Sequence, residues 1–182
     1  LNVMSGEEEA RITFLAARRW FGWSAGNILL LDIGGGSLEI AAGTDEYPDI
    51  ALSLPLGAGR MHSRFLSADQ PSEDDIAALR HLARKEIGRI AGDVNRVGKP
   101  EKIVGSSKTF RSLARIAGAA PSGDGIYVPR KLQRKDMPGI IDTLLSRTPA
   151  QRAELPGVSA ARSGQVLAGA IVADVAFTIF GI

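Results

Sequence analysis

The sequence predicts one α/β domain with a mixed sheet and helices on both faces. Its 182 residues are enough to bury one sizeable core without disulfides or metals. Hydrophobic residues make up 45% and charged residues 23%, as in an average globular protein. Strand and helix patterns follow in the order strand, hairpin, strand, strand, and then helix, strand, helix. This order predicts a sheet whose first three strands are antiparallel neighbours.

The first third of the chain contains a helix pattern followed by strand patterns. Ser5 and Glu8 form a Ser-x-x-Glu capping box, and acids crowd the following turn, where the helix dipole favours negative charge. Apolar residues from Ala10 to Phe21 recur at helical spacing. The predicted elements are the tail of a strand at residues 1–4, a helix over residues 6–21, and strands over residues 28–31, 38–42 and 49–54.

The rest of the chain is mainly helical in pattern. Ser72 and Asp75 cap a long helix, its apolar stripe runs from Ile76 to Val94, and Gly98 ends it. The other predicted elements are a short helix from Gly57 to about Leu66, a strand at residues 103–104, helices over residues 110–117, 137–146 and about 159–179, and a turn near residues 149–154.

Composition excludes several classes of protein. Lys and Arg total 22 against 20 for Asp and Glu, so a net charge of +2 does not favour duplex nucleic acid as a partner. The absence of cysteine excludes a disulfide scaffold, a thiolate zinc site and a cysteine nucleophile, and it fits a reducing compartment. The longest apolar stretch, residues 168–182, is interrupted by Asp174 and is shorter than the about 20 residues of a membrane span. We therefore expect a cytoplasmic protein without a membrane partner.

The segment Asp32-Ile33-Gly34-Gly35-Gly36-Ser37 directly follows a buried strand. Consecutive glycines let the backbone approach a ligand and turn several N–H groups toward one phosphate oxygen. A tight hairpin turn explains the segment equally well, although two glycines would suffice for it. A dinucleotide fingerprint is excluded because Glu39 stands at the position of its last glycine, and a Walker loop because no Gly-Lys-Ser/Thr follows.

Acidic residues lie close to this loop in the sequence. Asp32 stands where the strand meets the loop, and one or two carboxylates commonly hold a hydrated Mg²⁺ ion beside phosphates. An Asx turn that satisfies loop amides is the alternative. Glu39 lies on the far side of the hairpin, and it is either a second acid of the site or an exposed strand residue. Glu9 is one of three successive acids, and local physics does not select among them.

The segment Gly105-Ser106-Ser107-Lys108-Thr109 is a second small-residue loop, between a strand and a helix. It brings backbone amides, hydroxyl groups and a helix N-terminus together, and Lys108 adds a charge suited to phosphate. Two serines before a helix usually form only a cap. Two such loops in one domain nevertheless favour a polyanionic ligand.

Taken together, the segments from Ser5 to Arg11, Asp32 to Glu39 and Gly105 to Thr109 resemble the exopolyphosphatase and guanosine pentaphosphate phosphatase (Ppx/GppA) family. Leu155-Pro156-Gly157-Val158, with Ala161-Arg162 and Gly169-Ala170, is similar to the closing region of that family. The family belongs to the actin, sugar kinase and heat-shock ATPase superfold, in which two ribonuclease H-like lobes enclose an active site. The resemblance implies that residues 1–182 are the second, C-terminal lobe, because the Asp-x-Gly-Ser-Asn-Ser loop of the first lobe is absent. A start at Leu1 fits a fragment or a processed product.

The resemblance also implies a role for each motif. Glu9 matches the catalytic glutamate that activates water, and Asp32 and Glu39 match acids near the Mg²⁺ ion. Lys108 departs from many members, which have glycine there; it would crowd an adenosine but suit a phosphate chain. The implied phosphate-binding residues are Gly34, Gly35, Gly36, Ser37, Gly105, Ser106, Ser107, Lys108 and Thr109.

The expected function is that of a hydrolase that releases terminal phosphate from inorganic polyphosphate with the help of Mg²⁺ or another divalent cation. The alternatives are a guanosine pentaphosphate 5′-phosphatase and a non-catalytic lobe that senses phosphate or nucleotide. The isolated lobe is expected to be inactive, since half of the phosphate clamp would be missing. We also expect a homodimer, and Trp20 and Trp23 are interpreted as core or subunit contacts.

Overall fold

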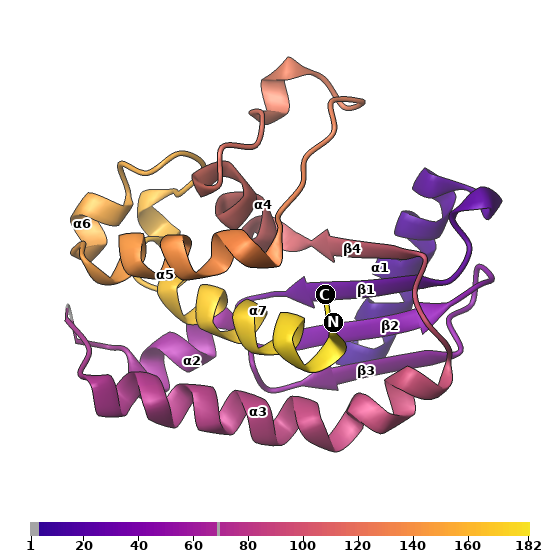
Figure 1. Ribbon diagram of the computed structural model, residues 1–182, viewed down its shortest axis with the longest axis horizontal. Coiled ribbons are helices and arrows are strands. Elements are labelled where there is room, and N and C mark those ends of the chain that lie inside the picture. The colour runs from indigo at the N-terminus through magenta and orange to yellow at the C-terminus, as the bar shows by residue number, and fades with distance from the viewer. Residues whose placement is uncertain (1–3, 69) are drawn as a thin grey trace.

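The sheet of this protein has four strands in the order β3-β2-β1-β4. The computed structural model describes residues 4–68 and 70–182. The central strand β1 pairs antiparallel with β2 and parallel with β4, and β2 pairs antiparallel with β3 (Figure 1). The predicted mixed sheet with three antiparallel neighbours is therefore confirmed. The strands are β1 (Ile28–Ile33), β2 (Leu38–Gly43), β3 (Ile50–Leu54) and β4 (Lys102–Ser106).

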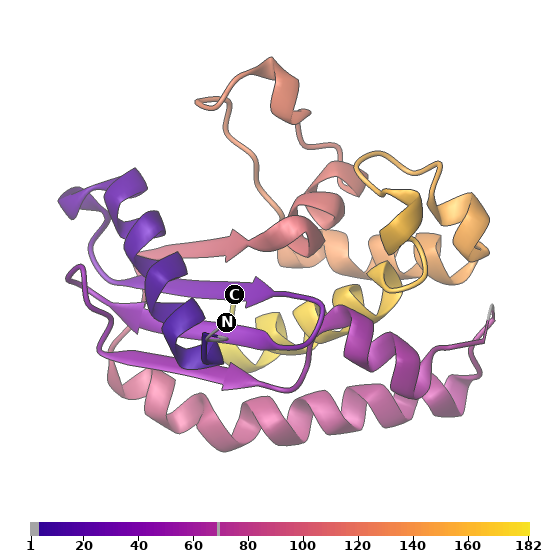
Figure 2. The ribbon, with the colours of Figure 1, turned by 180° about the vertical axis from the view of Figure 1, so that it is seen from behind.

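Helices cover both faces of the sheet, as predicted. Helix α1 (Gly6–Phe21) lies alone across one face, which Figure 2 shows from behind, and contacts β1, β2 and β3. The opposite face carries the other helices, with α7 lying between α3 and α5 (Figure 1). These are α2 (Ala58–Phe65), α3 (Glu73–Arg96), α4 (Ser107–Ile116), α5 (Met137–Leu145), α6 (Pro149–Arg152) and α7 (Val166–Phe180), with 3₁₀ turns at Trp23–Ala25, Ser122–Asp124, Arg134–Asp136 and Ala160–Arg162.

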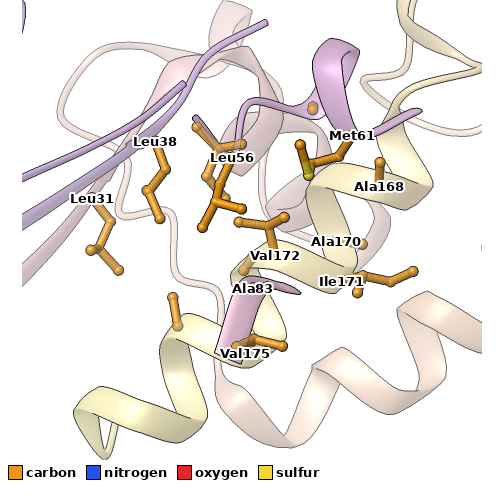
Figure 3. Close-up of a cluster of buried hydrophobic side chains, with 14 of the residues drawn as sticks. Leu31, Leu38, Leu56, Met61, Ala83, Ala168, Ala170, Ile171, Val172 and Val175 are labelled. Atoms are coloured by element: carbon orange, nitrogen blue, oxygen red, sulfur yellow. The ribbon is translucent and has the colours of Figure 1, made fainter. Parts of the chain in front are cut away.

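The alternation of side chains along β1 divides the core in two. Leu29, Leu31 and Ile33 enter the large cluster beneath α7, part of which Figure 3 shows. Ile28 and Leu30 point the other way and pack with Ala10 and Phe14 of α1. Since successive strand residues point to opposite faces, Asp32 is directed to the face covered by α1.

Several element boundaries differ from the sequence predictions. Strands β1 and β4 each extend two residues further, to Ile33 and Ser106, so the segment 105–109 is not a loop but a direct junction between β4 and α4. Two helix starts also differ. The last helix begins at Val166 and not near residue 159, because residues 160–162 form a 3₁₀ turn and Gly164 packs against the ring of His62, where a Cβ would lie 3.1 Å from Nε2. Helix α4 begins at Ser107, three residues before the predicted start, because Ser107 adopts a φ of +87° that turns the chain sharply out of β4. Residues 1–3 of the predicted N-terminal strand lie outside the described residues. None of the described helices has the length and apolarity needed to cross a bilayer.

Candidate phosphate and metal site

The strands bring Asp32 and Glu39 together at one end of the sheet. Asp32 pairs with Glu39 across the antiparallel ladder and with Ser106 across the parallel one. Side chains directly opposite each other in an antiparallel pair have Cβ atoms about 4.5–5.5 Å apart. Both carboxylates therefore lie on the face that α1 covers, and Ser106 at the end of β4 lies beside them.

Glu39 is a buried residue, so its interpretation as an exposed strand residue is wrong. Only 1% of Glu39 is exposed, and Ser53 Oγ donates a hydrogen bond of 3.0 Å to its Oε1. Burial raises the pKa of Glu39, hydrogen bonds from Ser37 and Ser53 oppose this, and the charges of Glu9 and Asp32 raise it further. The start of α1 covers this pair at Gly6, where a Cβ would lie 2.2 Å from Ser53 Oγ.

Asp32 is half-buried, and burial is the main cause that raises its pKa. Hydrogen bonds from Ser106 and Ser107 lower the pKa, the charge of Glu9 raises it and that of Arg111 lowers it. The hydrogen-bond partners of this carboxylate thus come from the β4–α4 junction and not from the amides of the glycine loop. This arrangement contradicts the Asx-turn interpretation.

The surroundings of α1 distinguish acids that are alike in sequence. Glu8 accepts hydrogen bonds from the backbone N–H and the hydroxyl of Ser5, which completes the capping box. The negative charge of Glu9 acts on both Asp32 and Glu39. Glu9 is also exposed, so it is accessible to water and substrate. The structure therefore places Glu9 with the other two acids and uses Glu8 as a cap.

The glycine loop is fixed on one side and open on the other. Its carbonyls accept hydrogen bonds from the start of α2: Ala58 N to Gly34 O and Arg60 N to Gly35 O, both 2.9 Å. A Cβ on Gly57 would lie 2.2 Å from Ser37 N, so only glycine allows this approach, while a Cβ on Gly35 would meet no atom within 4 Å. Within the described residues, the amides of Gly35 and Gly36 have no acceptor. Their free N–H groups favour an anion nest.

These loop glycines are not required by a left-handed turn. None of the three adopts a positive φ. A two-residue type I′ hairpin turn needs positive φ at both central positions. Close packing does not require them either, since a Cβ on Gly34 would meet no atom nearer than 3.6 Å and a Cβ on Gly35 or Gly36 would meet none within 4 Å. The open outer side of the loop, where a ligand could approach the backbone, therefore accounts for the glycines better than the hairpin turn does.

The junction between β4 and α4 has features that lower the local stability of the helix. Helix α4 has no side-chain cap and no acid in its first turn, and the non-glycine residue Ser107 has a positive φ. Lys108 stands in that turn, where the helix dipole disfavours a cation. Among the described residues, no carboxylate lies within ion-pair distance of Lys108. Strain and unfavourable charge at one place are typical of functional sites.

A buried hydrogen bond joins the start of α4 to the end of β1, beside the glycine loop. Thr109 Oγ1 donates a hydrogen bond of 2.8 Å to Ile33 O, immediately before the glycine loop. Gly169 of α7 allows this position, because a Cβ there would lie 2.5 Å from Thr109 Cγ2. Sequence reasoning missed Ser53, Gly57 and Arg111. The alternation of β3 toward the α1 face could have indicated Ser53, and glycine at a predicted helix start could have indicated Gly57.

The acids fit a magnesium ion that substrate and water help to coordinate. Among the described residues, no group of three or more His, Cys, Asp or Glu side chains could hold a metal ion. Mg²⁺ retains several waters and typically takes only one or two carboxylates together with phosphate oxygens. Burial is the main cause that raises the pKa of Asp32 and of Glu39, and the charge of Glu9 raises both pKa values further, so a cation there would relieve the repulsion between the acids.

Comparisons with known proteins identify the relatives of this chain. The Ppx/GppA phosphatase family model matches residues 1–182. Exopolyphosphatase 1 of Mycobacterium tuberculosis is 51% identical over 174 residues, which are 96% of this chain and 51% of that protein. The guanosine-5′-triphosphate,3′-diphosphate pyrophosphatase of Pseudoalteromonas atlantica is 33% identical over 126 residues, which are 69% of this chain and 25% of that protein.

A solved structure of an Aquifex aeolicus PPX-GPPA enzyme superposes with a TM-score of 0.81 at 22% identity, covering 98% of this chain and 58% of that one. The predicted fold class is therefore confirmed. The chain spans about half the length of Exopolyphosphatase 1. Since the family model matches the chain from end to end, the chain belongs to the Ppx/GppA phosphatase family.

Proposed function

We propose that the protein containing this chain is a metal-assisted exopolyphosphatase, which releases terminal phosphate from inorganic polyphosphate. The observation that supports this most directly is the convergence of Glu9, Asp32 and Glu39, from separate segments, between the glycine loop, which has unused donors, and the β4–α4 junction. General-base catalysis, a cation and an anion clamp are what phosphoryl transfer to water requires. We propose further that the chain is the second, C-terminal lobe and that another lobe completes the clamp.

In the proposed reaction, Glu9 acts as the general base. Its exposed carboxylate accepts a proton from a water molecule as the water oxygen forms a bond to the terminal phosphorus. The bond from that phosphorus to the bridging oxygen breaks, and the shortened polyphosphate leaves with the electron pair. Removing a well-placed general base typically costs 10²- to 10⁴-fold in rate, by order of magnitude.

The other site residues bind and orient. Asp32 would hold the divalent cation directly, because this residue is only half-buried. Glu39 would hold it through water, since its carboxylate accepts hydrogen bonds from Ser53 and Ser37. The bound cation supplies neutralisation of the phosphate charge. The free amides of Gly35 and Gly36 would bind phosphate oxygens, together with Ser37 and the β4–α4 junction from Gly105 to Thr109.

Guanosine pentaphosphate 5′-phosphatase activity is the second candidate, supported by the name of the Pseudoalteromonas relative. The same site would release the same group from that nucleotide. Lys108 favours polyphosphate, because a cation in the first turn of α4 suits a bare phosphate chain better than a nucleoside. A non-catalytic sensing lobe has no feature of the site in its favour.

Three further predictions concern the state of the protein. Cytoplasmic location fits the lack of cysteine. The homodimer stays a prediction, but Trp20 and Trp23 are 55% and 68% exposed, so their interpretation as core residues is wrong and a subunit contact remains. The isolated lobe is expected to lack activity, since losing preorganised donors commonly costs about 10²-fold or more each.

The test is phosphate release by the full-length protein. Long-chain polyphosphate, tripolyphosphate and guanosine pentaphosphate are supplied separately, with Mg²⁺ and with EDTA. We expect Mg²⁺-dependent release from polyphosphate at a higher kcat/KM than from the nucleotide. Higher kcat/KM on guanosine pentaphosphate would select the second candidate, and no release from any substrate would support a sensing lobe.

A further inference from the structure

A basic groove lies along α4, beside the acidic site. Its volume is about 470 Å³, which is within the usual range of small-molecule sites. Lys108, Arg111, Arg115 and Arg162 line it, with small or uncharged residues between them. No acidic or aromatic side chain is among the described residues that line it.

Among the described residues, none of the cations of this groove is in an ion pair, although Arg111 lies near the carboxylate of Asp32. The ion pairs of the described residues involve the arginines at positions 19, 80, 89 and 96, which are not in the groove. Like charges gathered without counterions repel one another. An anion with several charges would remove this repulsion, so the groove is suited to a polyanion.

Buried contacts hold the walls of the groove in place. Ser112 Oγ of α4 donates a hydrogen bond of 2.6 Å to Gly157 O on the opposite wall. Gly157 has a φ of +77°, and a Cβ there would lie 2.6 Å from Arg115 Cβ. Arg115 also donates a hydrogen bond to Ala119 O. The groove is thus largely formed before a ligand arrives, which reduces the entropy cost of binding.

The groove is continuous with the acids. Lys108 directly follows Ser107, which hydrogen-bonds to Asp32, and the Arg111 guanidinium lies close enough to lower the pKa of the Asp32 carboxyl. Arg115 is one helical turn further along α4, and Arg162 is on the segment before α7. A chain whose terminal phosphate lies near Asp32 could therefore continue along these cations.

We propose that this groove binds the phosphate groups behind the terminal one, and that Arg115 and Arg162 make the protein prefer long phosphate chains to short chains and to guanosine pentaphosphate. The proposal rests on the proposed function. Guanidinium groups bind phosphate oxygens in a bidentate manner. The groove offers no aromatic ring on which a guanine could stack. Binding strength thus comes from repeated phosphates, and it increases with chain length.

The test compares Arg115→Gln, Arg162→Gln and the double variant in the full-length protein, with tripolyphosphate and long-chain polyphosphate as substrates. The double variant should raise KM for the long chain about tenfold and leave kcat unchanged. A tenfold change corresponds to the loss of about one charge-assisted hydrogen bond. The KM for tripolyphosphate should change much less, because a short chain reaches fewer groove cations. The salt dependence of the long-chain KM should also decrease.

Matched variants separate this effect from misfolding. Arg84→Gln removes an exposed arginine of α3, outside the groove, and should leave both KM values unchanged. Arg162→Lys should retain most long-chain affinity. Ser159→Glu adds a negative charge to the groove without removing a contact, and should raise the long-chain KM alone.

Two outcomes would overturn the inference while the proposed function stands: an unchanged long-chain KM, or an equal KM increase for both chain lengths, each in an active double variant. A wild-type protein that releases no phosphate from either chain would instead contradict the proposed function.

Discussion

Helices α1 and α3 begin with almost the same chemistry and lie in different surroundings. Each has a serine N-cap with a complete capping box, and each has acids at three positions of its first turn. The start of α1 lies on Ser53 and Glu39 at the end of the sheet, with a glycine at the point of contact. The corresponding position of α3 is Glu73, which is exposed.

The difference shows that a favourable sequence at a helix start does not indicate a function unless the residues packed around that start are known. In α3 the acids complement a dipole in solvent. In α1 the charge of one acid, Glu9, acts on two other carboxylates, which costs electrostatic energy and is the observation on which its proposed role rests. Helix α4 shows the converse, since its uncapped start with Lys108 is locally unfavourable.

The largest expected effect concerns Glu9. In the full-length protein, Glu9→Gln keeps the shape of the side chain but removes the proton acceptor, so kcat for polyphosphate should fall by roughly 10²- to 10⁴-fold. Steady-state kinetics with thermal melts measure this. KM should not rise, because losing a negative charge beside a polyanion cannot weaken attraction to it.

The controls come from both helix starts. Glu7→Gln in α1 and Asp74→Asn in α3 remove acids at the second helical position of each helix, and neither should change kcat. If Glu9→Gln were as mild as Glu7→Gln, the two helix starts would be equivalent, and the general base would have to be Asp32 or Glu39.

The next effect concerns glycines in the two environments. A Cβ at Gly57 would lie 2.2 Å from Ser37 N and 2.3 Å from Gly36 C, which are backbone atoms that cannot move independently. Gly57→Ala should therefore destabilise the protein by about 1–3 kcal/mol and displace the glycine loop, with loss of activity. Urea denaturation and phosphate release measure the two effects.

Gly88 of α3 is the matched control, because a Cβ there would meet no atom within 4 Å. Gly88→Ala should stabilise the protein by about 0.5–1 kcal/mol, the difference between glycine and alanine in a helix, and should leave activity unchanged. An active, fully stable Gly57→Ala protein would contradict the close packing of the loop on α2.

A smaller effect concerns the pH dependence of stability. Burial raises the pKa of Asp32, so this group contributes stability below its ordinary pKa of about 4 and loses it as pH rises through the folded value. Asp32→Asn should thus melt at a higher temperature than wild type at pH 7 without divalent cations, and the gap should close below pH of about 4.

Magnesium provides the second readout for Asp32. Mg²⁺ should raise the melting temperature of the wild-type protein and not that of Asp32→Asn, since an ion that binds only the folded state stabilises the folded protein. The pKa of Asp75 in α3 is shifted in the opposite direction, because hydrogen bonds from Ser72 lower it. Asp75 therefore contributes stability at pH 7, and this contribution is lost as the pH falls. An Asp32→Asn protein that is less stable than wild type at pH 7 would contradict the raised pKa.

Much of the fold could be predicted, because periodicity and caps are local. The bounds of α1, the cap of α3 and the antiparallel strands follow directly from the pattern. The start of α4 could not be predicted, because the positive φ of Ser107 is imposed by its tertiary position. The burial of Glu39 could not be predicted either, because it depends on Gly6 of α1 lying over Ser53.

The smallest expected effect returns to the two capping boxes. Ser5→Ala and Ser72→Ala each remove the hydroxyl that accepts a hydrogen bond from the backbone of the third helical residue. Each should lower the melting temperature by about 2–4 °C, since a lost cap costs about 1 kcal/mol. Only Ser5→Ala should also lower kcat, because fraying at the start of α1 moves Glu9 relative to Asp32, whereas α3 contributes no residue to the site. Equal losses of stability with equal kcat values would show that the position of Glu9 does not depend on the cap, and that the sheet contacts of Gly6 alone hold this end of α1.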